Sequence, residues 1–401
     1  MNTAAVREHL AGLQAAQKTL HELPIEARVS AVGRVLDAWS DAGSPVRVRL
    51  LAEHPATSGL STENLAAGLE LGLRRDGWGH AALEGLVERE APKSARLAGV
   101  TTVLHGGVIP MPTLLDALAP LVLGSPVLAK PAARDLVTPR LLVESVAELA
   151  PELGACVAIA DVRRDDDAAI DALLETERVI VTGGDDTVTA IRARLGRDTK
   201  LVAHGHKLSV AWLGADANLE VSAARLAVDV ATWDQLGCLS PVACWVEGDA
   251  ERARAFATSL AAALEAREQV TPRGEVEAAA AARIASERSD AELRSAAEGV
   301  VALHVGSTWT VVAEGDAAPR PSPLHRFVRV HPVATLAAWR TAMGSLRGHV
   351  AGLAHAGGSE ADALELAQSV GASRATAFGE LQTPPLDWAR DGLGVLSALL
   401  A

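Results

Sequence analysis

The chain has 401 residues, of which 49% are apolar and 22% charged, a balance that supports a large buried core and excludes a disordered chain. Its formal net charge of −13, from 50 acidic and 37 basic side chains, argues against a nucleic-acid partner, because no basic stripe offsets the repulsion. No apolar run reaches the ~18 residues of a membrane span, and the N-terminal MNTAAVREHL lacks an export signal, so we predict a cytoplasmic protein.

The first ninety residues are predicted to be helical. Leu10, Leu13 and Leu20 keep a helical period, and the pattern returns over 29–39, after the break at Pro24. From about residue 100, short β-branched runs alternate with helical stretches, which is typical of a parallel sheet covered on both faces. The predicted strands here are 100–104, 126–130, 155–160, 178–182 and 200–204, and the predicted helices are 113–124, 141–150 and 185–195.

The same alternation continues to about residue 380. Helices are predicted over 218–232, 249–267 and 274–298, and strands over 242–247, 300–305, 309–313 and 326–330. The sequence therefore predicts the α/β class, with two domains and a cleft between them. The predicted boundaries are 1–212 for the N-terminal helices and a nucleotide-binding domain, 213–380 for a second domain, and 381–401 for a C-terminal helix that returns to the first.

The three cysteines cannot all pair, and a chain of this length needs no disulfides. Cys156 and Cys244 lie within apolar strand runs and are predicted to be core residues. Cys238 lies between a predicted helix and strand in WDQLGCLSPVACWVE (233–247), where a thiol can be exposed and act as a nucleophile. A buried structural cysteine is the alternative.

Lys130 ends a predicted strand in VLAKPAARD (127–135). The carboxyl end of a parallel strand is where such sheets bind ligands in a crevice, so Lys130 is a candidate ligand-binding residue. A surface lysine that closes the strand is the alternative.

Gly183 and Gly184 connect a buried strand to a helix in VIVTGGDDT (179–187). Glycines let a phosphate approach a helix N-terminus, where backbone N–H groups attract it. Asp185 and Asp186 in the first turn argue against direct phosphate contact and fit a capping role.

Three histidines lie near predicted strand ends. His105 follows strand 100–104 and precedes a helix that starts with proline, and a purely structural histidine is the alternative there. AHGHKLS (203–209) carries His204, His206 and Lys207. Two histidines without a cysteine or acidic partner nearby make a poor zinc site, so we predict no metal.

Taken in order, LHGGVIPMP, VLAKPAARD, VTGGDDT, AHGHKLS and WDQLGCLSP resemble the aldehyde dehydrogenase superfamily. The sequence more closely resembles the acyl-CoA reductase family that includes the fatty acyl-CoA reductase of bacterial bioluminescence. The Asp-Gln-x-x-Cys-x-Ser-Pro segment and the Gly-His-Lys stretch match best, and the resemblance is strong from about 100 to 250. It implies a Rossmann-type nucleotide-binding domain, an α/β catalytic domain that bears the cysteine, and an active site in the cleft.

The resemblance also implies roles for individual residues. The catalytic cysteine of the family corresponds to Cys238, and its lysine that binds the cofactor ribose corresponds to Lys130. The remaining cofactor contacts would come from turns at strand ends, namely Thr182, Gly183 and Gly184 in the nucleotide loop and His204 and Gly205 beside the nicotinamide ring.

Two departures from the superfamily pattern favour thioester reduction with NADPH. Ala203 stands where oxidising aldehyde dehydrogenases carry the glutamate that activates water, so an acyl-cysteine would survive to accept hydride. Ala133, followed by Arg134, stands where an acidic residue binds the 2′-hydroxyl of NAD, and a guanidinium there suits the 2′-phosphate of NADPH.

Two other departures remove family residues. The oxyanion-stabilising asparagine should lie near Gly107 or Val108, and a ribose-binding glutamate should precede 323–332, but neither is present. Loss of one oxyanion donor costs roughly 10²–10³ in rate, and His105 or backbone N–H groups are the candidate substitutes. His206 is a further catalytic candidate, as a source of the positive charge that a thiolate needs.

We therefore predict an enzyme that uses NADPH to reduce an acyl-CoA, or an acyl-carrier-protein thioester, to the aldehyde through an acyl-cysteine. An acylating aldehyde dehydrogenase that runs toward acyl-CoA is one alternative. A catalytically idle scaffold that binds an acyl-transfer partner is the other, and a homo-oligomer stays open.

Overall fold

The computed structural model describes residues 1–401, apart from the side chain of Glu298. The chain divides into two compact units, and neither is one unbroken segment. The first unit comprises 1–58, 72–206 and 384–401, and the second comprises 59–71 and 207–383. Segment 59–71 thus groups with the second unit, although the predicted boundary placed it in the first.

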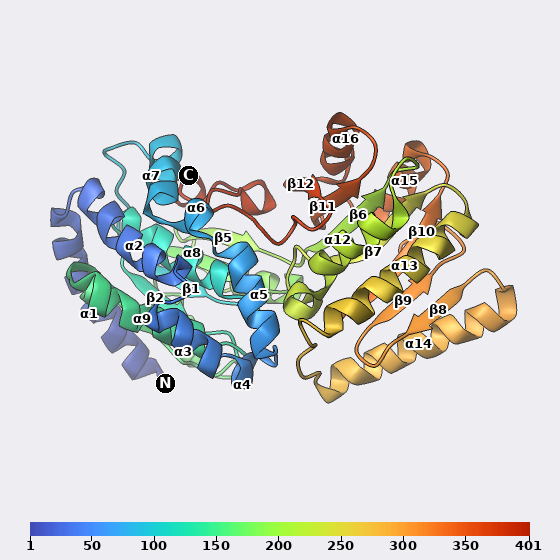
Figure 1. The fold of residues 1–401 in the computed structure, drawn as a ribbon. Helices are drawn as coiled ribbons and strands as arrows, with labels where there is room; N and C mark the ends of the chain where they lie inside the picture. The colour runs from blue at the N-terminus through green and yellow to red at the C-terminus, as the bar shows by residue number, and fades with distance from the viewer. The chain divides into compact units, whose positions relative to one another are not determined.

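The first unit contains a five-stranded sheet in the order β3-β2-β1-β4-β5, in which every neighbouring pair is parallel (Figure 1). The chain winds outward in one direction from β1 and in the other from β4. In open α/β sheets such a switch in winding direction opens a crevice at the carboxyl ends of the strands. The strands are β1 (Thr101–Leu104), β2 (Val127–Lys130), β3 (Val157–Ile159), β4 (Arg178–Thr182) and β5 (Lys200–His204).

Helices cover this sheet with apolar residues at helical spacing. Val6, Leu10 and Leu13 of α1 pack in one core with Leu128 of β2 and Val179 of β4. The helices are α1 (Thr3–Glu22), α2 (Ile25–Ser40), α3 (Pro45–Glu53), α4 (Pro55–Ser58), α6 (Arg75–Trp78), α7 (His80–Glu90), α8 (Pro110–Val122), α9 (Val137–Leu149), α10 (Asp167–Leu173), α11 (Asp185–Arg192) and α17 (Ser397–Leu400).

Three expectations for the first unit need correction. Cys156 lies in the short 3-10 helix η1 (Pro151–Cys156) before β3, so it is a core residue but not a strand residue. The helix predicted over 113–124 begins at Pro110, because proline is well tolerated in the first helical turn. Segment 381–401 is mostly irregular, and its helical parts are only η4 (Arg390–Gly392) and α17.

The second unit contains a seven-stranded sheet in the order β12-β11-β6-β7-β10-β9-β8. Only the edge pair β8–β9 is antiparallel. The analysis of the sequence missed β6, β11 and β12. The strands are β6 (Leu208–Leu213), β7 (Pro241–Glu247), β8 (Ala302–Val305), β9 (Thr310–Ala313), β10 (Phe327–Val333), β11 (Val350–Ala356) and β12 (Arg374–Ala377).

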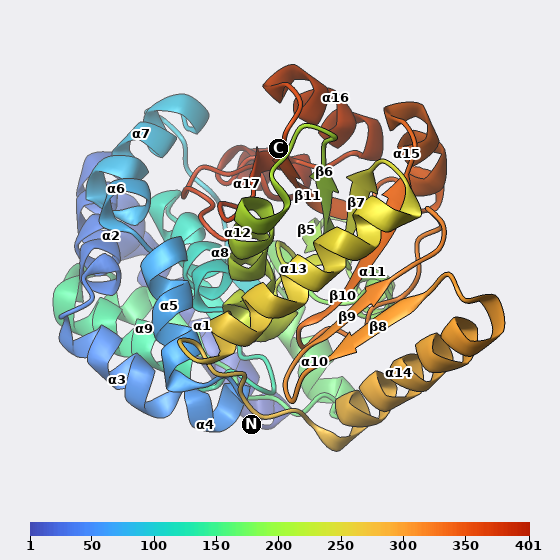
Figure 2. The same ribbon diagram turned by 45° about the vertical axis from the view of Figure 1, so that its right-hand side comes forward.

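Tryptophans form the centre of one core of the second unit. Trp212 and Trp245 each meet Trp339 edge to face, with centroids 6.0 and 6.5 Å apart. Figure 2 shows α13 crossing the sheet and α14 running beside β8. The helices are α5 (Thr62–Gly72), whose last residue falls outside this unit, α12 (Leu219–Ala231), α13 (Ala250–Glu268), α14 (Ala278–Glu298), α15 (Leu336–Ala342) and α16 (Glu360–Val370).

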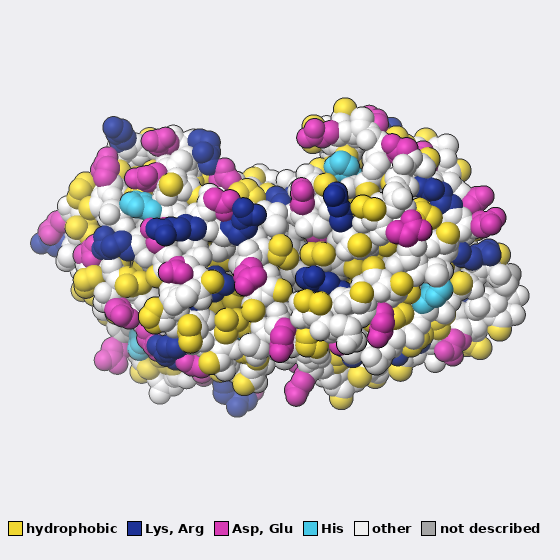
Figure 3. All heavy atoms as spheres, viewed as in Figure 1, with side chains coloured by type: hydrophobic (Ala, Val, Ile, Leu, Met, Phe, Trp, Pro, Cys, Tyr) yellow, Lys and Arg dark blue, Asp and Glu magenta, His cyan; other side chains and the backbone are white. Residues whose placement is uncertain are grey.

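Among the described residues, no helix has both the length and the apolar character needed to cross a membrane. On the face shown in Figure 3, basic and acidic side chains are interspersed and do not gather into a patch of one sign. This face therefore does not show the basic stripe that nucleic acid requires.

Candidate active site

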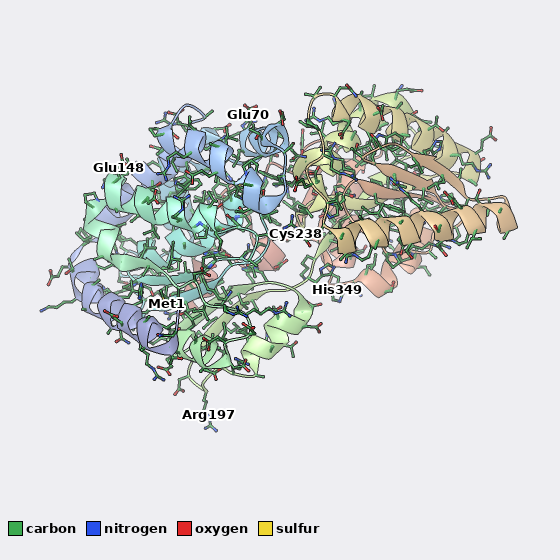
Figure 4. The ribbon with its side chains drawn as sticks, turned by 90° about the horizontal axis from the view of Figure 1, so that it is seen from below. Met1, Glu70, Glu148, Arg197, Cys238 and His349 are labelled. Atoms are coloured by element: carbon green, nitrogen blue, oxygen red, sulfur yellow. The ribbon has the colours of Figure 1, made fainter. Side chains whose placement is uncertain are left out.

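Cys238 lies in the connection between η2 (Thr232–Gln235) and β7, at the amino-terminal edge of the second sheet (Figure 4). Its side chain is exposed, whereas Cys156 and Cys244 are buried. Burial raises the pKa of Cys156 to about 11 and that of Cys244 well above its ordinary value. Cys238 is therefore the thiol that an electrophile in solution can reach.

The turn before Cys238 has a backbone conformation that bulky residues rarely adopt. Trp233, Asp234 and Gln235 have φ angles of 60°, 50° and 60°, and all three side chains are buried. A second run of the same kind, 324–326, precedes β10, with φ angles of 66°, 57° and 65°. Each left-handed residue costs about 1–2 kcal/mol, so the surrounding contacts must hold both turns in place.

The two left-handed turns are hydrogen-bonded to each other. The backbone N–H of His325 donates to the Asp234 carbonyl at 3.1 Å. The Gln235 side chain accepts from the Phe327 N–H at 2.8 Å and donates to the Pro241 carbonyl at 2.8 Å. Gln235 thus ties the turn to the first residue of β7, so the loop that carries Cys238 is anchored at both ends. The loop is also held from β6, because the Ser209 hydroxyl donates to the Cys238 carbonyl at 2.8 Å.

Helix α5 supplies two residues to this turn from far away in the sequence. Asn64 accepts from the Trp233 N–H at 2.8 Å and donates to the Asp234 carboxylate at 2.8 Å. One turn later, only glycine fits at position 68, because a Cβ there would lie 2.4 Å from the Trp233 indole. These contacts explain why segment 59–71 belongs to the second unit. A glycine inside a helical pattern was the only sequence signal for them.

His105 follows β1 in the first unit, next to the switch in strand order. Its Nε2 is buried and has no hydrogen-bond partner among the described residues. Burial lowers the pKa of His105 to about 4, against the opposing effect of Asp116 and Asp135. The ring is therefore neutral at pH 7 and can offer a ligand one hydrogen bond but no charge.

The turns after β1 and β4 approach each other because both contain glycine. A Cβ on Gly106 would lie 2.3 Å from the Thr182 carbonyl oxygen. In contrast, a Cβ on Gly107 or Gly184 would meet nothing within 4 Å. Open space at the start of α11, beside the strand-order switch, is compatible with a phosphate group at this helix N-terminus.

Asp185 does not cap α11, contrary to the sequence expectation. Its carboxylate accepts from the backbone N–H of His206 at 2.8 Å, and the helix has no side-chain cap. A Cβ on Gly205 would lie 2.5 Å from this carboxylate. Asp185 therefore holds the chain that leaves β5 close to the start of α11, while the His206 side chain is exposed.

Residues 390–391 bind two of the predicted cofactor residues. The Arg390 guanidinium lies 3.1 Å from Asp116, and the Thr182 hydroxyl donates to the same carboxylate at 3.3 Å. His204 Nδ1 lies 2.8 Å from the Asp391 carboxylate. Asp116, His204 and Arg390 line a small cavity of about 40 Å³, together with Trp388. Sequence analysis missed both residues because it expected a plain helix here.

Lys130 is the last residue of β2, and Arg134 lies on the loop that follows this strand. Lys130 is half-buried, and burial lowers its pKa while Asp161 opposes the shift. The Arg134 guanidinium donates to the Ser58 carbonyl. The predicted site residues thus lie at the carboxyl ends of four neighbouring strands of the first sheet. Lys130, Thr182 and His204 end β2, β4 and β5, and the others lie on the turns that follow: His105 after β1, Arg134 after β2, Gly183 and Gly184 after β4, and Gly205 after β5.

Residues 81–401 match the sequence profile of the family described as acyl-CoA reductase (LuxC). The chain belongs to the acyl-CoA reductase (LuxC) family. This membership confirms the family predicted from the sequence motifs, and it makes the chain an oxidoreductase that acts on aldehyde or acyl groups. No group of three metal-ligating side chains is found among the described residues of this family member.

Solved structures confirm the predicted aldehyde dehydrogenase-like fold. An oxidoreductase from Marinobacter aquaeolei aligns with a TM-score of 0.74 and 15% identity over 96% of this chain and 84% of its own. Aldehyde dehydrogenase 21 from Physcomitrella patens, in complex with succinate, gives 0.74 and 13% over 96% and 84%. NADP-dependent glyceraldehyde-3-phosphate dehydrogenase from Bacillus halodurans, complexed with NADP, gives 0.70 and 15% over 94% and 83%. No curated protein sequence matches the chain.

Proposed function

We propose that the protein reduces an acyl-CoA thioester to the free aldehyde through an acyl group carried on Cys238, with NADPH as reductant. The observation that carries the proposal is the exposed thiol of Cys238 on an anchored turn, in a chain of the acyl-CoA reductase family whose other two thiols are buried. A nucleophile held in one orientation lowers the entropic cost of reaching the thioester.

In the proposed reaction the Cys238 thiolate attacks the thioester carbonyl, and the C–S bond to CoA breaks. The CoA thiolate leaves and takes up a proton. A bound nicotinamide would supply the hydride that reduces the acyl group. The resulting thiohemiacetal on Cys238 then expels the cysteine thiolate, which releases the aldehyde and restores the enzyme.

Ala203 of β5 supports reduction over hydrolysis. Oxidising members of the superfamily resemble this chain at the neighbouring His204-Gly205 turn but carry a carboxylate where Ala203 stands. An alanine methyl group cannot remove a proton from water, so the acyl-cysteine would persist until it is reduced.

The first unit offers residues that fit a dinucleotide. Gly184 leaves open space at the start of α11, and the His105 ring lies after β1 at the switch in strand order, with a buried Nε2 that has no hydrogen-bond partner among the described residues. Lys130 would bind the ribose. The preference for NADPH rests on the place of Arg134 in the sequence, because Ala133 and Arg134 stand where an acidic residue would bind the 2′-hydroxyl of NAD, and a guanidinium suits a 2′-phosphate.

Intact-protein mass spectrometry tests the proposal directly. The protein is mixed with a panel of acyl-CoAs and then with NADPH or NADH. We expect one acyl adduct on Cys238 that disappears with NADPH as aldehyde forms. Cys238→Ala should form no adduct and lose about 10⁴-fold or more in rate, as removal of a nucleophile does elsewhere. Cys156→Ala is the matched control and should keep both the acyl adduct on Cys238 and the wild-type rate.

Different outcomes would redirect the proposal. If only an acyl-carrier-protein thioester forms the adduct, the carrier protein and not CoA is the acyl donor. Full aldehyde production by Cys238→Ala would overturn the acyl-cysteine intermediate. Arg134→Gln should lower the ratio of NADPH to NADH efficiency, and an unchanged ratio would remove Arg134 from the cofactor site. No adduct and no cofactor binding would favour an idle scaffold.

A further inference from the structure

We propose that Asn64, Asp234 and Arg326 are positioning residues that hold the left-handed turn before Cys238 and thereby set the reactivity of its thiol. The inference deepens the proposed function and rests on it, because it takes Cys238 as the nucleophile. None of the three side chains needs to touch the substrate.

Asp234 is the centre of the arrangement. Its carboxylate accepts from the Arg326 guanidinium at 2.8 Å, from Asn64 at 2.8 Å and from the Gly274 N–H at 3.0 Å. Asp234 and Arg326 are both buried, and burial raises the pKa of Asp234 while Arg326 opposes the shift. A buried charge pair of this kind contributes little net stability, and we take its role here to be to fix the geometry of the turn.

Arg326 links the turn to a rigid neighbour. It donates to Glu268 at the end of α13 at 2.6 Å and to the Thr271 carbonyl at 2.8 Å. Arg326 is itself the last residue of the second left-handed run. One side chain therefore fixes both strained turns to α13.

A displacement of the left-handed turn would also displace Cys238, because hydrogen bonds restrain the short segment that connects them. The Leu236 N–H donates to the Trp233 carbonyl at 2.8 Å, and the Ser240 N–H donates to the Gly237 carbonyl at 3.0 Å. Two backbone hydrogen bonds thus span the stretch from the left-handed run to β7. A shift at Asp234 becomes a shift at the thiol.

Arg329 provides a matched control from the same part of the chain. It is as buried as Arg326 and pairs with Glu314 at 2.6 Å and with Glu287 of α14. Glu314 directly follows β9, Glu287 lies on α14, and Arg329 also donates to the Pro321 carbonyl at 2.7 Å. None of these partners belongs to the turn before Cys238. Arg326→Lys and Arg329→Lys therefore remove the same chemical group from equally buried ion pairs.

The experiment compares wild type, Arg326→Lys, Arg329→Lys and Asn64→Ala as full-length proteins. Iodoacetamide is the probe, and peptide mass spectrometry resolves the alkylation rate of Cys238 as a function of pH. Unfolding free energy, kcat and KM for the best acyl-CoA are measured in parallel. Asn64→Ala covers the case in which Arg326→Lys does not fold.

We expect Arg326→Lys and Asn64→Ala to lower kcat by about 10- to 100-fold with little change in KM, as misplacement of a reacting group does. Both should also shift the pH profile of Cys238 alkylation. Arg329→Lys should lose comparable stability yet keep the wild-type profile. Equal profiles in all folded variants, or equal losses in the two lysine variants, would overturn positioning. Altered alkylation in a protein that never forms an acyl adduct would overturn the proposed function instead.

Discussion

The turns that carry the candidate cofactor residues and the turn that carries the candidate nucleophile are built from opposite kinds of residue. After β1 in the first unit, the backbone comes close to the Thr182 carbonyl at Gly106, whereas Gly107 and Gly184 leave open space around the turns after β1 and β4. In the second unit, residues 233–235 and 324–326 adopt left-handed conformations with large side chains throughout.

The difference follows from what each region has to provide. A surface that receives a dinucleotide must leave space, and glycine leaves it at no steric cost. A turn that fixes a thiol must be held from several sides, and only side chains such as Asp234 and Gln235 can supply the bonds. In the turns of the second unit, side-chain contacts offset the backbone strain, whereas glycines avoid such strain in the turns of the first unit.

The largest expected effect concerns buried titratable groups, one in each unit. Burial lowers the pKa of His105 to about 4 but raises that of Asp229 to about 7. As pH falls from 6.5 to 4, the unfolded chain takes up the His105 proton first, so stability from His105 is lost, by up to about 3 kcal/mol. Stability from Asp229 is complete below pH 3.8 and is lost as pH rises toward 7.

Denaturant unfolding of wild type, His105→Gln and Asp229→Asn across pH 4–7.5 measures these contributions. The advantage of wild type over His105→Gln should shrink toward acid, and the advantage over Asp229→Asn should grow toward acid. Slopes of the same sign would contradict the assigned burial of one group.

Gly106→Ala tests whether the first unit depends on close backbone approach. The added Cβ would lie 2.3 Å from the Thr182 carbonyl, which cannot move without shifting β4. We expect a loss of about 1–3 kcal/mol in unfolding free energy, as overpacking usually causes. Gly184→Ala is the control, because its Cβ meets nothing within 4 Å and should change stability by less than about 0.5 kcal/mol. Equal effects would show that space is not what selects glycine.

The smallest effect separates strain from side-chain loss at Leu324, where φ is 66°. Leu324→Ala and Leu324→Gly both remove the side chain, but only glycine relaxes the left-handed backbone. The glycine variant should be more stable by about 1 kcal/mol, the reverse of the usual order. Gly107→Ala, at φ +82°, should cost a similar amount. Thermal and denaturant unfolding of all three variants measure this, and a less stable glycine variant at 324 would rule out strain there.

The elements were predictable because their apolar periods are regular. The five strands of the first sheet follow from short apolar runs such as RVIVT, but the switch in strand order between β1 and β4 was not predicted. The exposed thiol of Cys238 was also a sequence candidate. The residues that hold it were not, because Asn64 lies 170 residues from Asp234 and nothing local marks the pair. Arg326 read as the first residue of a strand, since bulky residues seldom signal a left-handed backbone.

The C-terminal contributions were hidden for a similar reason. Arg390 and Asp391 meet Asp116 and His204 across 274 and 187 residues. Asp391 adopts a φ of 58° followed by Gly392 at 77°, which breaks the expected helix. Side-chain pairs at such separation are decided by tertiary packing, which a single sequence does not display.

The passage of the chain between the units after residues 58, 71, 206 and 383 has a consequence for biosynthesis. During translation, Asn64 leaves the ribosome long before the turn that it binds. Arg390 and Asp391, the partners of Asp116 and His204, are synthesised only near the end of translation. Contacts so distant in sequence slow folding and prolong the exposure of apolar surface. We therefore expect neither unit to mature as an independent cotranslational product, and a chain stalled before residue 390 would lack the Arg390 partner of Asp116 and the Asp391 partner of His204.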